Sequence, residues 1–459
     1  MEDFLTGKKH VHFIGIGGSG MYPLAQILHS NGFYLTGSDN NETETLELVR
    51  KMGITVFLGQ RAENIKGADL IVYTAAIMDD NPELIAAKES GVTTIERATL
   101  LGLITSKYSN TVCVSGTHGK TTTTSMLTQM FLAEKVDISA VIGGKLKAIG
   151  GSGIAGSSDT MVCEACEFLD HFLKLSVDIA VVLNVDEDHL DYFKNLENII
   201  SSFHKFCENA TKAVIINGND ANSIKAVEGI SGKDIITFGK SSGNNWYPQN
   251  IRHIGPLETA FTVMFDDKSL CEAVIHVPGE HNILNAVAAV AAAYYCGVST
   301  EAIVKGLDEF KGAGRRFEKY GEYGGITVVD DYGHHPAEIG ATLNTAKGMG
   351  FKRVWAVHQP FTYSRTYTLM DDFAEALSIA DKTVLTEIMG SREKNTFNVC
   401  SKDLCDKIEG AVWFPEFEQV ADYVSENARE GDLIITLGCG DVYKVARMIC
   451  SKLEKKISI

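Results

Sequence analysis

Apolar residues occur in short continuous runs that alternate, along most of the chain, with longer segments of helical periodicity. Examples of these runs are residues 112–116 (VCVSG), 179–185 (IAVVLNV) and 433–438 (LIITLG). Consecutive apolar positions are typical of strands buried on both faces, as in a parallel sheet. Because helical segments separate the runs, the sequence predicts an α/β fold of doubly wound parallel sheets. The stretch 236–279 departs from this alternation and predicts β-hairpins.

Two segments interrupt the pattern and indicate domain boundaries. The first, TSKYSN at 105–110, is polar, and the second, FKGAGRRFE at 310–318, is rich in glycine and basic residues. A chain of 459 residues has room for about three domains of ordinary size. We therefore expect three α/β domains, at residues 1–107, 108–312 and 313–459.

The composition is that of an ordinary soluble protein, with 45% hydrophobic and 22% charged residues. The net charge of −17 disfavours nucleic acid as a partner, because an acidic surface repels a phosphate backbone. The most apolar run, residues 285–298, is shorter than the ~20 residues of a membrane-spanning helix and predicts a buried alanine-rich helix. The N-terminal residues lack the apolar core of a signal peptide, so we expect a cytoplasmic protein, monomeric or homodimeric.

The ten cysteines are scattered, and several lie inside apolar runs. Cys163 and Cys166 form a C-x-x-C pattern, but a structural zinc site needs four ligands and no second pair is evident. We interpret both as strand or turn residues that stay reduced in a cytosolic protein.

A first glycine-rich loop, GIGGSG, lies between a strand-like run and a helix-like segment. Its glycines, Gly15, Gly17 and Gly20, allow a tight turn whose backbone N–H groups can approach a diphosphate at a helix N-terminus. Asp39 follows at the distance where an acid can bind a ribose hydroxyl. These residues alone suggest NAD as readily as any other diphosphate, and a turn without a ligand is the simpler alternative.

A second loop, GTHGKTTTT, also joins a strand-like run to a helix-like segment. It is shorter than the general phosphate-binding loop, since Val114 stands where that pattern has its first glycine. Gly116 and Gly119 can still expose N–H groups, Lys120 can reach terminal phosphates, and Thr121 can hold Mg²⁺. The strand–loop–helix context makes ATP the preferred ligand.

Eight stretches, in this order along the chain, make the sequence similar to the Mur ligase family. They are FIGIGGSGM, TAAIMDDNPEL, SGTHGKTTTT, NVDEDHLDYF, PGEHNILNAVAA, GAGRRFE, VDDYGHHPAEI and QPFTYSRT. The resemblance runs nearly end to end. It implies a Rossmann-like N-terminal domain that holds a UDP-sugar, a central ATPase domain with a phosphate-binding loop, and a Rossmann-like C-terminal domain that supplies the amino-acid site.

GTHGKTT together with DDYGHHP makes the sequence most similar to the members that add L-alanine to UDP-N-acetylmuramate, or to their peptide-recycling relatives. This resemblance implies a peptidoglycan precursor ligase that uses ATP and Mg²⁺. Such a ligase first phosphorylates the lactyl carboxylate, and the amine then attacks the acyl phosphate, which splits one difficult step into two easier ones.

The resemblance also assigns residues to the two phosphorylated ligands. Residues matched to the UDP-sugar site are Gly15, Gly17, Gly18, Ser19, Gly20, Ser38 and Asp39. Residues matched to the ATP site are Gly116, Thr117, His118, Gly119, Lys120, Thr121, Thr122, His281, Asn282, Asn285 and Arg316. For the asparagines, the alternative is a helix cap followed by a buried helix, and for Arg315 and Arg316 it is an interdomain salt bridge.

Metal, catalytic and amino-acid roles follow in the same way. The resemblance matches Glu167 to the Mg²⁺ ligand that faces Thr121, and His189 to the ligand of a second Mg²⁺; the alternative is a solvated acidic cluster. Residues given catalytic roles are Lys120, Glu167, His189, His334 and Arg365, and those given amino-acid-binding roles are Tyr332, His334 and Arg365.

The sequence departs from the family in the amino-acid site. The usual pattern has a histidine after Gln-Pro, often followed by arginine, whereas this chain has Phe361 and Thr362. Arg365 is then expected to carry more of the task of binding a carboxylate. Two other hypotheses for the function remain: an NAD oxidoreductase, which the first loop suggests, and a non-catalytic sensor of ATP or a UDP-sugar.

Overall fold

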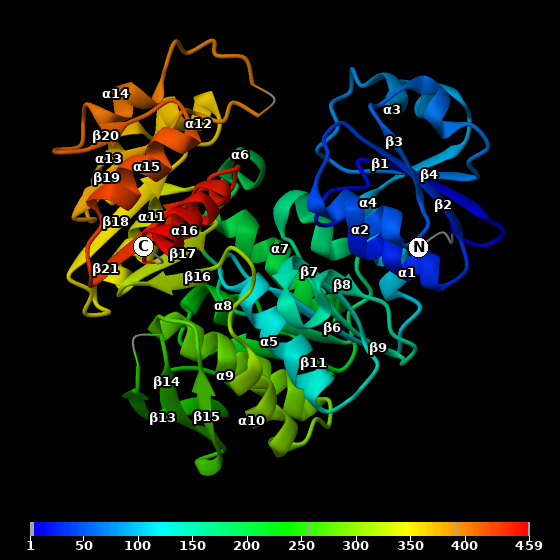
Figure 1. Cartoon of the computed structure of the whole chain (residues 1–459). Helices are drawn as coiled ribbons and strands as arrows, with labels where there is room; N and C mark the ends of the chain where they lie inside the picture. Colours follow the sequence, from blue (N-terminus) through cyan, green and yellow to red (C-terminus); the bar gives the residue numbers. More distant parts are fainter. Residues whose placement is uncertain (1–3, 256, 392, 458–459) are drawn as a thin grey trace. The chain divides into compact units, whose positions relative to one another are not determined.

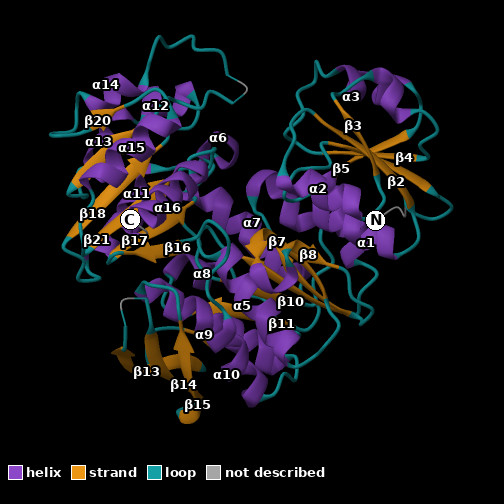
Figure 2. Cartoon of the chain, in the orientation of Figure 1, coloured by secondary structure: helices purple, strands orange, loops and turns teal. Residues whose placement is uncertain are grey.

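The computed structural model describes residues 4–255, 257–391 and 393–457, with only the backbone of Asp191 and Ile457 (Figure 1). The chain divides into two compact units. The first comprises residues 1–252, 259–276 and 280–310, and the second comprises residues 253–258, 277–279 and 311–459. Helices flank the strands of each sheet (Figure 2).

The N-terminal part of the first unit is a five-stranded parallel sheet in the order β3-β2-β1-β4-β5. Its strands are β1 His10–Ile14, β2 Tyr34–Asp39, β3 Thr55–Leu58, β4 Leu70–Tyr73 and β5 Thr93–Glu96. Its helices are α1 Tyr22–Ser30, α2 Glu44–Lys51, η1 Ala62–Ile65, α3 Pro82–Glu89 and α4 Arg97–Thr105. The strand order reverses at β1, so the first glycine loop follows the strand where open α/β sheets bind ligands.

The rest of the first unit is built on a ten-stranded sheet in the order β15-β14-β13-β12-β11-β10-β6-β9-β7-β8. Its strands are β6 Asn110–Ser115, β7 Ser139–Leu146, β8 Gly151–Ile154, β9 Thr160–Glu164, β10 Ile179–Val182, β11 Ala213–Asn217, β12 Asp234–Phe238, β13 Trp246–His253, β14 Thr259–Phe265 and β15 Lys268–Ile275. The strands from β12 to β7 pair in parallel. The predicted hairpin character is confirmed for β14 and β15, which pair antiparallel, whereas β12 belongs to the parallel sheet.

The helices of this larger sheet include α5, which follows the second glycine loop, and α9, which contains the alanine-rich run. They are α5 Lys120–Ala133, η2 Lys147–Ile149, η3 Phe168–Lys174, α6 Leu190–Phe193, α7 Leu196–Asn209, α8 Ala221–Lys225, α9 Glu280–Tyr295 and α10 Thr300–Glu309. The apolar run after Asn285 lies in α9, and its alanines and valines up to Ala293 are buried as predicted. Gly306 of α10 would carry a Cβ only 2.6 Å from the Cα of Met130, so glycine there permits close packing on α5.

The second unit contains a six-stranded sheet in the order β16-β17-β21-β18-β19-β20. The strands are β16 Glu318–Tyr323, β17 Ile326–Asp331, β18 Arg353–His358, β19 Lys382–Leu385, β20 Val412–Trp413 and β21 Asp432–Leu437. The helices are α11 Pro336–Lys347, α12 Tyr363–Thr368, α13 Met370–Leu377, α14 Ser401–Cys405, α15 Phe417–Asn427 and α16 Tyr443–Ile457. Separate apolar clusters include Leu343 with Phe373 in one and Val424 with Ile449 in the other.

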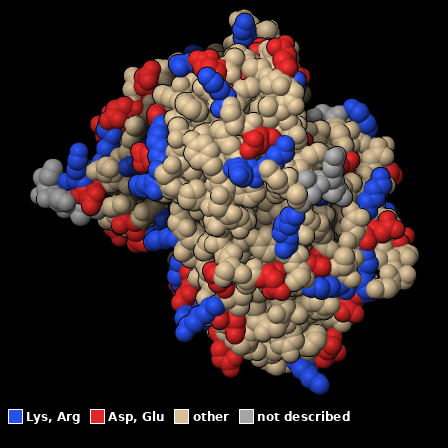
Figure 3. All heavy atoms as spheres, turned by 90° about the vertical axis from the view of Figure 1, so that its right-hand side faces the viewer, with Lys and Arg blue, Asp and Glu red and all other residues tan. Residues whose placement is uncertain are grey.

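The prediction of an α/β fold with three sheet-containing domains is confirmed. The boundaries at 107/108 and 312/313 remain predictions. No helix in the described part of the chain combines the length and apolarity that crossing a membrane requires. On the face drawn in Figure 3, acidic and basic side chains are interspersed.

Candidate active site

The first glycine loop is held by the strand beside it. The N–H groups of Gly15 and Ile16 donate to the carbonyl oxygen of Ser38 at 2.8 and 3.0 Å. The N–H of Gly17 donates to Oδ2 of Asp39 at 3.0 Å, and a Cβ on Gly17 would lie 2.8 Å from that oxygen. Asp39 therefore fixes the loop backbone, a structural task that its prediction as a ribose ligand did not include. The Ser38 hydroxyl is buried and has no partner within the described chain.

Arg97 lies beside the same loop. A Cβ on Gly20 would lie 3.2 Å from Nη1 of Arg97, the first residue of α4. No local pattern predicts this cation, because Arg97 is far from the loop in the sequence. The signal that could have found it is its place just after β5, since the carboxyl ends of parallel strands meet at one edge of a sheet. Ser19 is exposed, and its carbonyl accepts from Ser152 Oγ at 2.9 Å.

The second glycine loop joins β6 to α5. Gly116 and Gly119 have φ values of +142° and +89°, which favour glycine. The N–H of Thr117 and the N–H of His118 donate to the backbone and side-chain oxygens of Asn184, after β10. The N–H groups in the first turn of α5 have no intrahelical partner, so they can receive phosphate oxygens. His118 is exposed and Thr122 is partly buried.

Lys120 is tied to the protein's own oxygens. Its Nζ donates to the carbonyl oxygens of Gly116 and Thr117 at 2.5 and 3.1 Å, and to Glu167 Oε1 at 2.9 Å. Burial alone would lower the pKa of Lys120, but its interactions with Glu167, Cys166 and Glu164 together leave the pKa raised. Lys120 is therefore a permanent cation at the start of α5.

The two glutamates of CEACE take different partners. Thr121 Oγ1 donates to Glu164 Oε1 at 3.1 Å, and the N–H of Gly143 donates to Glu164 Oε2 at 2.7 Å. Glu167 is bound by Lys120, and its role as the Mg²⁺ ligand that faces Thr121 remains a prediction. Glu164, which received no role from the sequence, thus joins the site. The oxygen Glu167 Oε2 is buried without a partner among the described residues.

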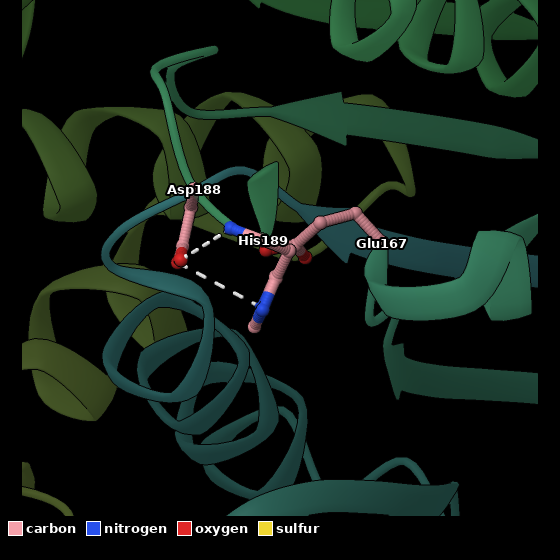
Figure 4. Close-up of side chains that lie close together, drawn as sticks. All are labelled: Glu167, Asp188 and His189. Carbon is pink, nitrogen blue, oxygen red and sulfur yellow. Dashed lines mark hydrogen bonds and ion pairs between the residues drawn. The ribbon is translucent and has the colours of Figure 1, made fainter. Parts of the chain in front are cut away.

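Three side chains could hold a cation together. The ligand atoms of Glu167, Asp188 and His189 all lie within 4.8 Å of one another (Figure 4). His189 has a left-handed backbone with φ of +50°, and its ring lies 4.6 Å from the Phe168 ring, centroid to centroid. The N–H of His189 donates to Asp188 Oδ1 at 2.7 Å. The two carboxylates, one of which has the partnerless oxygen Glu167 Oε2, fit Mg²⁺, which prefers oxygen ligands. Asp188 was missed because it is one of several adjacent acids in the sequence.

The asparagines of α9 reach the second glycine loop. A Cβ on Gly119 would lie 2.6 Å from Asn285 Oδ1, and Asn285 Nδ2 donates to Asn282 Oδ1 at 3.0 Å. Both asparagines are buried, whereas His281 is exposed. The structure therefore brings Asn282 and Asn285 to the predicted ATP loop as a bonded pair.

The predicted residues of the second unit cluster at the ends of β17 and β21. Arg315 Nε pairs with the buried Asp330 at 2.9 Å, so Arg315 forms a salt bridge within its own unit. Burial raises the pKa of Asp330 to about 6 even though Arg315 opposes this. The guanidinium carbons of Arg315 and Arg316 lie 5.1 and 5.2 Å from the centroid of the Tyr332 ring.

His334 and Arg365 form the polar part of this cluster. His334 Nδ1 lies 3.2 Å from the Tyr332 carbonyl oxygen and 3.3 Å from Glu338 Oε2. Burial lowers the pKa of His334; Glu338 opposes the shift and Arg365 adds to it. Arg365 Nη1 is buried and has no partner among the described residues. Phe361 forms an isolated backbone bridge with Met389.

Family models match most of the chain. Residues 10–109 match the model described as "Mur ligase family, catalytic domain", residues 114–293 match "Mur ligase middle domain", and residues 315–440 match "Mur ligase, glutamate ligase domain". The chain is 46% identical over 447 residues to UDP-N-acetylmuramate–L-alanine ligase of Acetivibrio thermocellus, which covers 96% of this chain and 95% of the relative. It is 44% identical over 461 residues to the enzyme of that name from Caldanaerobacter subterraneus, with 99% and 100% covered.

Solved structures agree with these matches. The crystal structure of UDP-N-acetylmuramate–alanine ligase from Thermotoga maritima superimposes with a TM-score of 0.84 at 27% identity, covering 98% of this chain and 100% of that one. A murein peptide ligase from Psychrobacter arcticus shares the fold, with a TM-score of 0.74 at 24% identity over 97% and 98% of the two chains. With an end-to-end relative at 46% identity and three family models in order, the chain belongs to the Mur ligase family.

Proposed function

We propose that the chain is an ATP- and Mg²⁺-dependent ligase that joins L-alanine to the lactyl carboxylate of UDP-N-acetylmuramate, in peptidoglycan precursor synthesis. The observation that carries the proposal is the 46% and 44% identity, over nearly the full length, to relatives named for that reaction. The geometry supports the reaction type, because a strand–glycine loop–helix with Lys120 lies against carboxylates that can hold a cation.

The reaction proceeds in two balanced steps. The γ-phosphoryl group of ATP passes to a carboxylate oxygen of the sugar acid, which releases ADP and leaves an acyl phosphate. The amine of alanine then attacks the acyl carbon, the bond to phosphate breaks, and inorganic phosphate leaves with the former carboxylate oxygen. The amine loses a proton on the way to the amide.

The chain's residues at the second loop position ATP and neutralise charge. We assign the N–H groups at the start of α5 and the Lys120 ammonium to the phosphates, and Asn282 and Asn285 to the adenine side. Thr121, Glu167 and His189 would hold Mg²⁺, with Glu164 and Asp188 as further oxygen donors. When bound, the ion supplies charge neutralisation for the transferring phosphoryl group.

The second unit is assigned to the amino acid. Arg365 offers a guanidinium nitrogen without a partner, which suits the alanine carboxylate. His334 is held neutral by its lowered pKa, so its ring can accept the proton that the ammonium group must lose before attack. Tyr332 lies next to His334, with ring centroids 5.6 Å apart, and we assign it to the same amino-acid site.

The first loop is assigned to the diphosphate of UDP-N-acetylmuramate, with Arg97 as the nearby cation that the loop itself lacks. We place the enzyme in the cytoplasm, where its nucleotide substrates are made, as a monomer or a homodimer.

The test is ADP release from purified protein with ATP, Mg²⁺ and UDP-N-acetylmuramate, against a panel of amino acids and peptides. We expect turnover with L-alanine, and weaker turnover with glycine and serine, because one methyl group is worth only ~1–3 kcal/mol of discrimination. A clear preference for a peptide would assign the chain to the recycling branch. ADP release without an amine would indicate a different activity. Oxidation or reduction of NAD would support the alternative hypothesis of an oxidoreductase.

A further inference from the structure

The segment that carries Arg365 is braced by a loop to which no role has been assigned. This loop follows β19, and its Met389 pairs with the segment before α12. The N–H of Thr362 donates to the Met389 carbonyl at 3.0 Å, and the N–H of Met389 donates to the Pro360 carbonyl at 2.9 Å. The loop therefore fixes the backbone where the chain enters α12.

The same loop packs closely against the first side chain of α12. A Cβ on Gly390 would lie 2.3 Å from Cε2 of Tyr363, so the Tyr363 ring rests directly on the Gly390 backbone. A side chain at Gly390 would displace Tyr363, and with it the start of α12. This packing adds a second fixed point next to the backbone pairing.

Glu393, from the same loop, binds the first turn of α12 with its carboxylate. Oε2 accepts from the N–H of Ser364 at 2.8 Å, and Oε1 accepts from the Ser364 hydroxyl at 2.5 Å. Burial would raise the pKa of Glu393, but these bonds, together with one from the Tyr363 backbone and the charge of Arg365, leave it lowered. Glu393 is therefore ionised at neutral pH and holds α12 at the residue next to Arg365.

Arg365 has one nitrogen, Nη1, that finds no acceptor in the part of the chain that the structure describes. Its Nη1 is buried and has no partner among the described residues, and no salt bridge of Arg365 occurs among them. Glu393 lies near enough for Arg365 to lower its pKa, yet both of its oxygens are bound to Ser364. A buried guanidinium nitrogen without an acceptor is unfavourable, so this arrangement favours an anionic ligand at Nη1.

We propose that Glu393 is a positioning residue for the amino-acid carboxylate: it holds α12 so that Arg365 presents a free N–H to the substrate, and it does not neutralise Arg365 itself. This inference rests on the proposed function. Glu393 then contributes to the affinity for alanine indirectly, because it orients Arg365. In this chain Phe361 and Thr362 replace the polar pair typical of the family, so affinity for the carboxylate depends more heavily on the orientation of Arg365.

The experiment is steady-state kinetics of Glu393→Gln in the full-length protein, with each of the three substrates varied in turn. Glutamine has the same shape but no charge and only one acceptor oxygen, so it loses the charge-assisted bonds that the two Glu393 oxygens accept from the Ser364 N–H and hydroxyl. We expect KM for alanine to rise roughly tenfold, with KM for ATP, KM for the sugar acid and kcat within about twofold. Glu375→Gln, an exposed site on α13, is the matched control and should change none of these.

A double-mutant cycle with Arg365→Lys separates positioning from general loss of structure. If Glu393 acts through Arg365, Glu393→Gln should add less than about twofold to the alanine KM of Arg365→Lys. Equal effects in both backgrounds would overturn the proposal, as would a rise in all three KM values with a lower melting temperature. If Glu393→Gln does not fold, Ser364→Ala removes one of the two bonds and should raise the alanine KM by about threefold.

The cycle also distinguishes this inference from the proposed function. A wild type that does not turn over alanine would overturn both. A wild type that uses alanine, with an Arg365→Lys variant impaired in alanine binding and a Glu393→Gln variant unchanged, would overturn the role of Glu393 alone.

Discussion

The two glycine loops of the first unit lie at similar strand–helix junctions, but their charges differ. The first loop contains no cation of its own: its Gly17 N–H is bound to the Asp39 carboxylate, and the cation beside it, Arg97, comes from the start of α4. The second loop ends in Lys120, which is paired with Glu167 next to a possible cation site. The first loop is thus suited to holding a diphosphate that does not react, and the second to stabilising charge that moves.

This difference has an energetic reason. The N–H groups of the first loop are assigned to a diphosphate whose charge does not change during the reaction, so they contribute affinity without accelerating a step. A cation fixed beside the transferring group stabilises charge that develops in the transition state, and it therefore lowers the barrier. We expect changes in the first loop to alter KM and changes in the second loop to alter kcat.

The largest expected effect is that of Lys120→Ala. Removing the ammonium group should lower kcat by about 10²- to 10³-fold, since one preorganised group that stabilises transition-state charge is worth that much. KM for the sugar acid should stay within about threefold, because its predicted site lies on the first loop. The measurement is ADP release at saturating substrates. If the variant lost affinity for the sugar acid and kept a normal kcat, the second loop would bind the sugar acid, and the assignment of the two loops would be wrong.

Gly17→Ala is expected to have a smaller effect, on KM and not on kcat. The new Cβ would lie 2.8 Å from Asp39 Oδ2 and 3.0 Å from Leu46, so the Gly17–Asp39 bond must lengthen and the loop must shift. KM for UDP-N-acetylmuramate should rise roughly tenfold, with kcat within about threefold. Gly340→Ala is the control, because its Cβ meets nothing closer than 3.8 Å. A fall in kcat at unchanged KM would mean that the first loop acts in the chemistry.

The pH dependence should come from neither loop. The raised pKa of Lys120 keeps it protonated below pH 10, whereas burial lowers the pKa of His334 from its ordinary value near 6.5. Since the neutral ring is the active form, kcat/KM for alanine should be flat near neutrality and should fall as pH drops through the lowered pKa. A pH series from 5 to 9 measures this. In His334→Gln the acid limb should disappear, and a limb that persists or lies above pH 6.5 would exclude His334.

The smallest effects are expected at Cys163 and Cys166, which lie on β9 and in the turn before Glu167. Cys163 is fully buried, and burial raises the pKa of the Cys166 thiol, so neither is a reactive thiolate. Cys163→Ser and Cys166→Ser should each keep kcat within about threefold. Metal analysis of the wild type should find no zinc. Stoichiometric zinc that is lost in either variant would contradict this interpretation.

The pattern of apolar residues and the lengths of the apolar runs predicted much of the fold. Buried parallel strands appear as short continuous apolar runs, and the helices between them as longer segments of helical periodicity. The runs after Asn110, Ile179 and Asp432 became central strands, and the alanine-rich run became the buried α9. The hairpin segment was harder to predict. β12 looks like the start of a hairpin in the sequence, yet its backbone pairs in parallel with β11, and this pairing depends on the chain's path in space.

Sequence motifs predicted the site residues that are close together in the sequence, but they did not predict the residues that only folding brings together. Lys120 and Thr121 could be found from one loop, and the resemblance singled out Glu167, but the contact of Thr121 with Glu164, at the end of β9, has no signal in the sequence. Arg97 and Glu393 carry no local pattern at all. They reach their neighbours through strand order and loop packing, which no spacing along the chain records.

The most direct measurement of coupled ligation follows oxygen from substrate to product. UDP-N-acetylmuramate labelled with ¹⁸O in its lactyl carboxylate is turned over with ATP, Mg²⁺ and L-alanine, and the released phosphate is analysed by mass spectrometry. If the γ-phosphoryl group passes to the carboxylate, each phosphate must carry one oxygen from that carboxylate. Phosphate that holds oxygen from water and none from the carboxylate would show that the second loop hydrolyses ATP without activating the sugar acid, and would contradict the proposed mechanism.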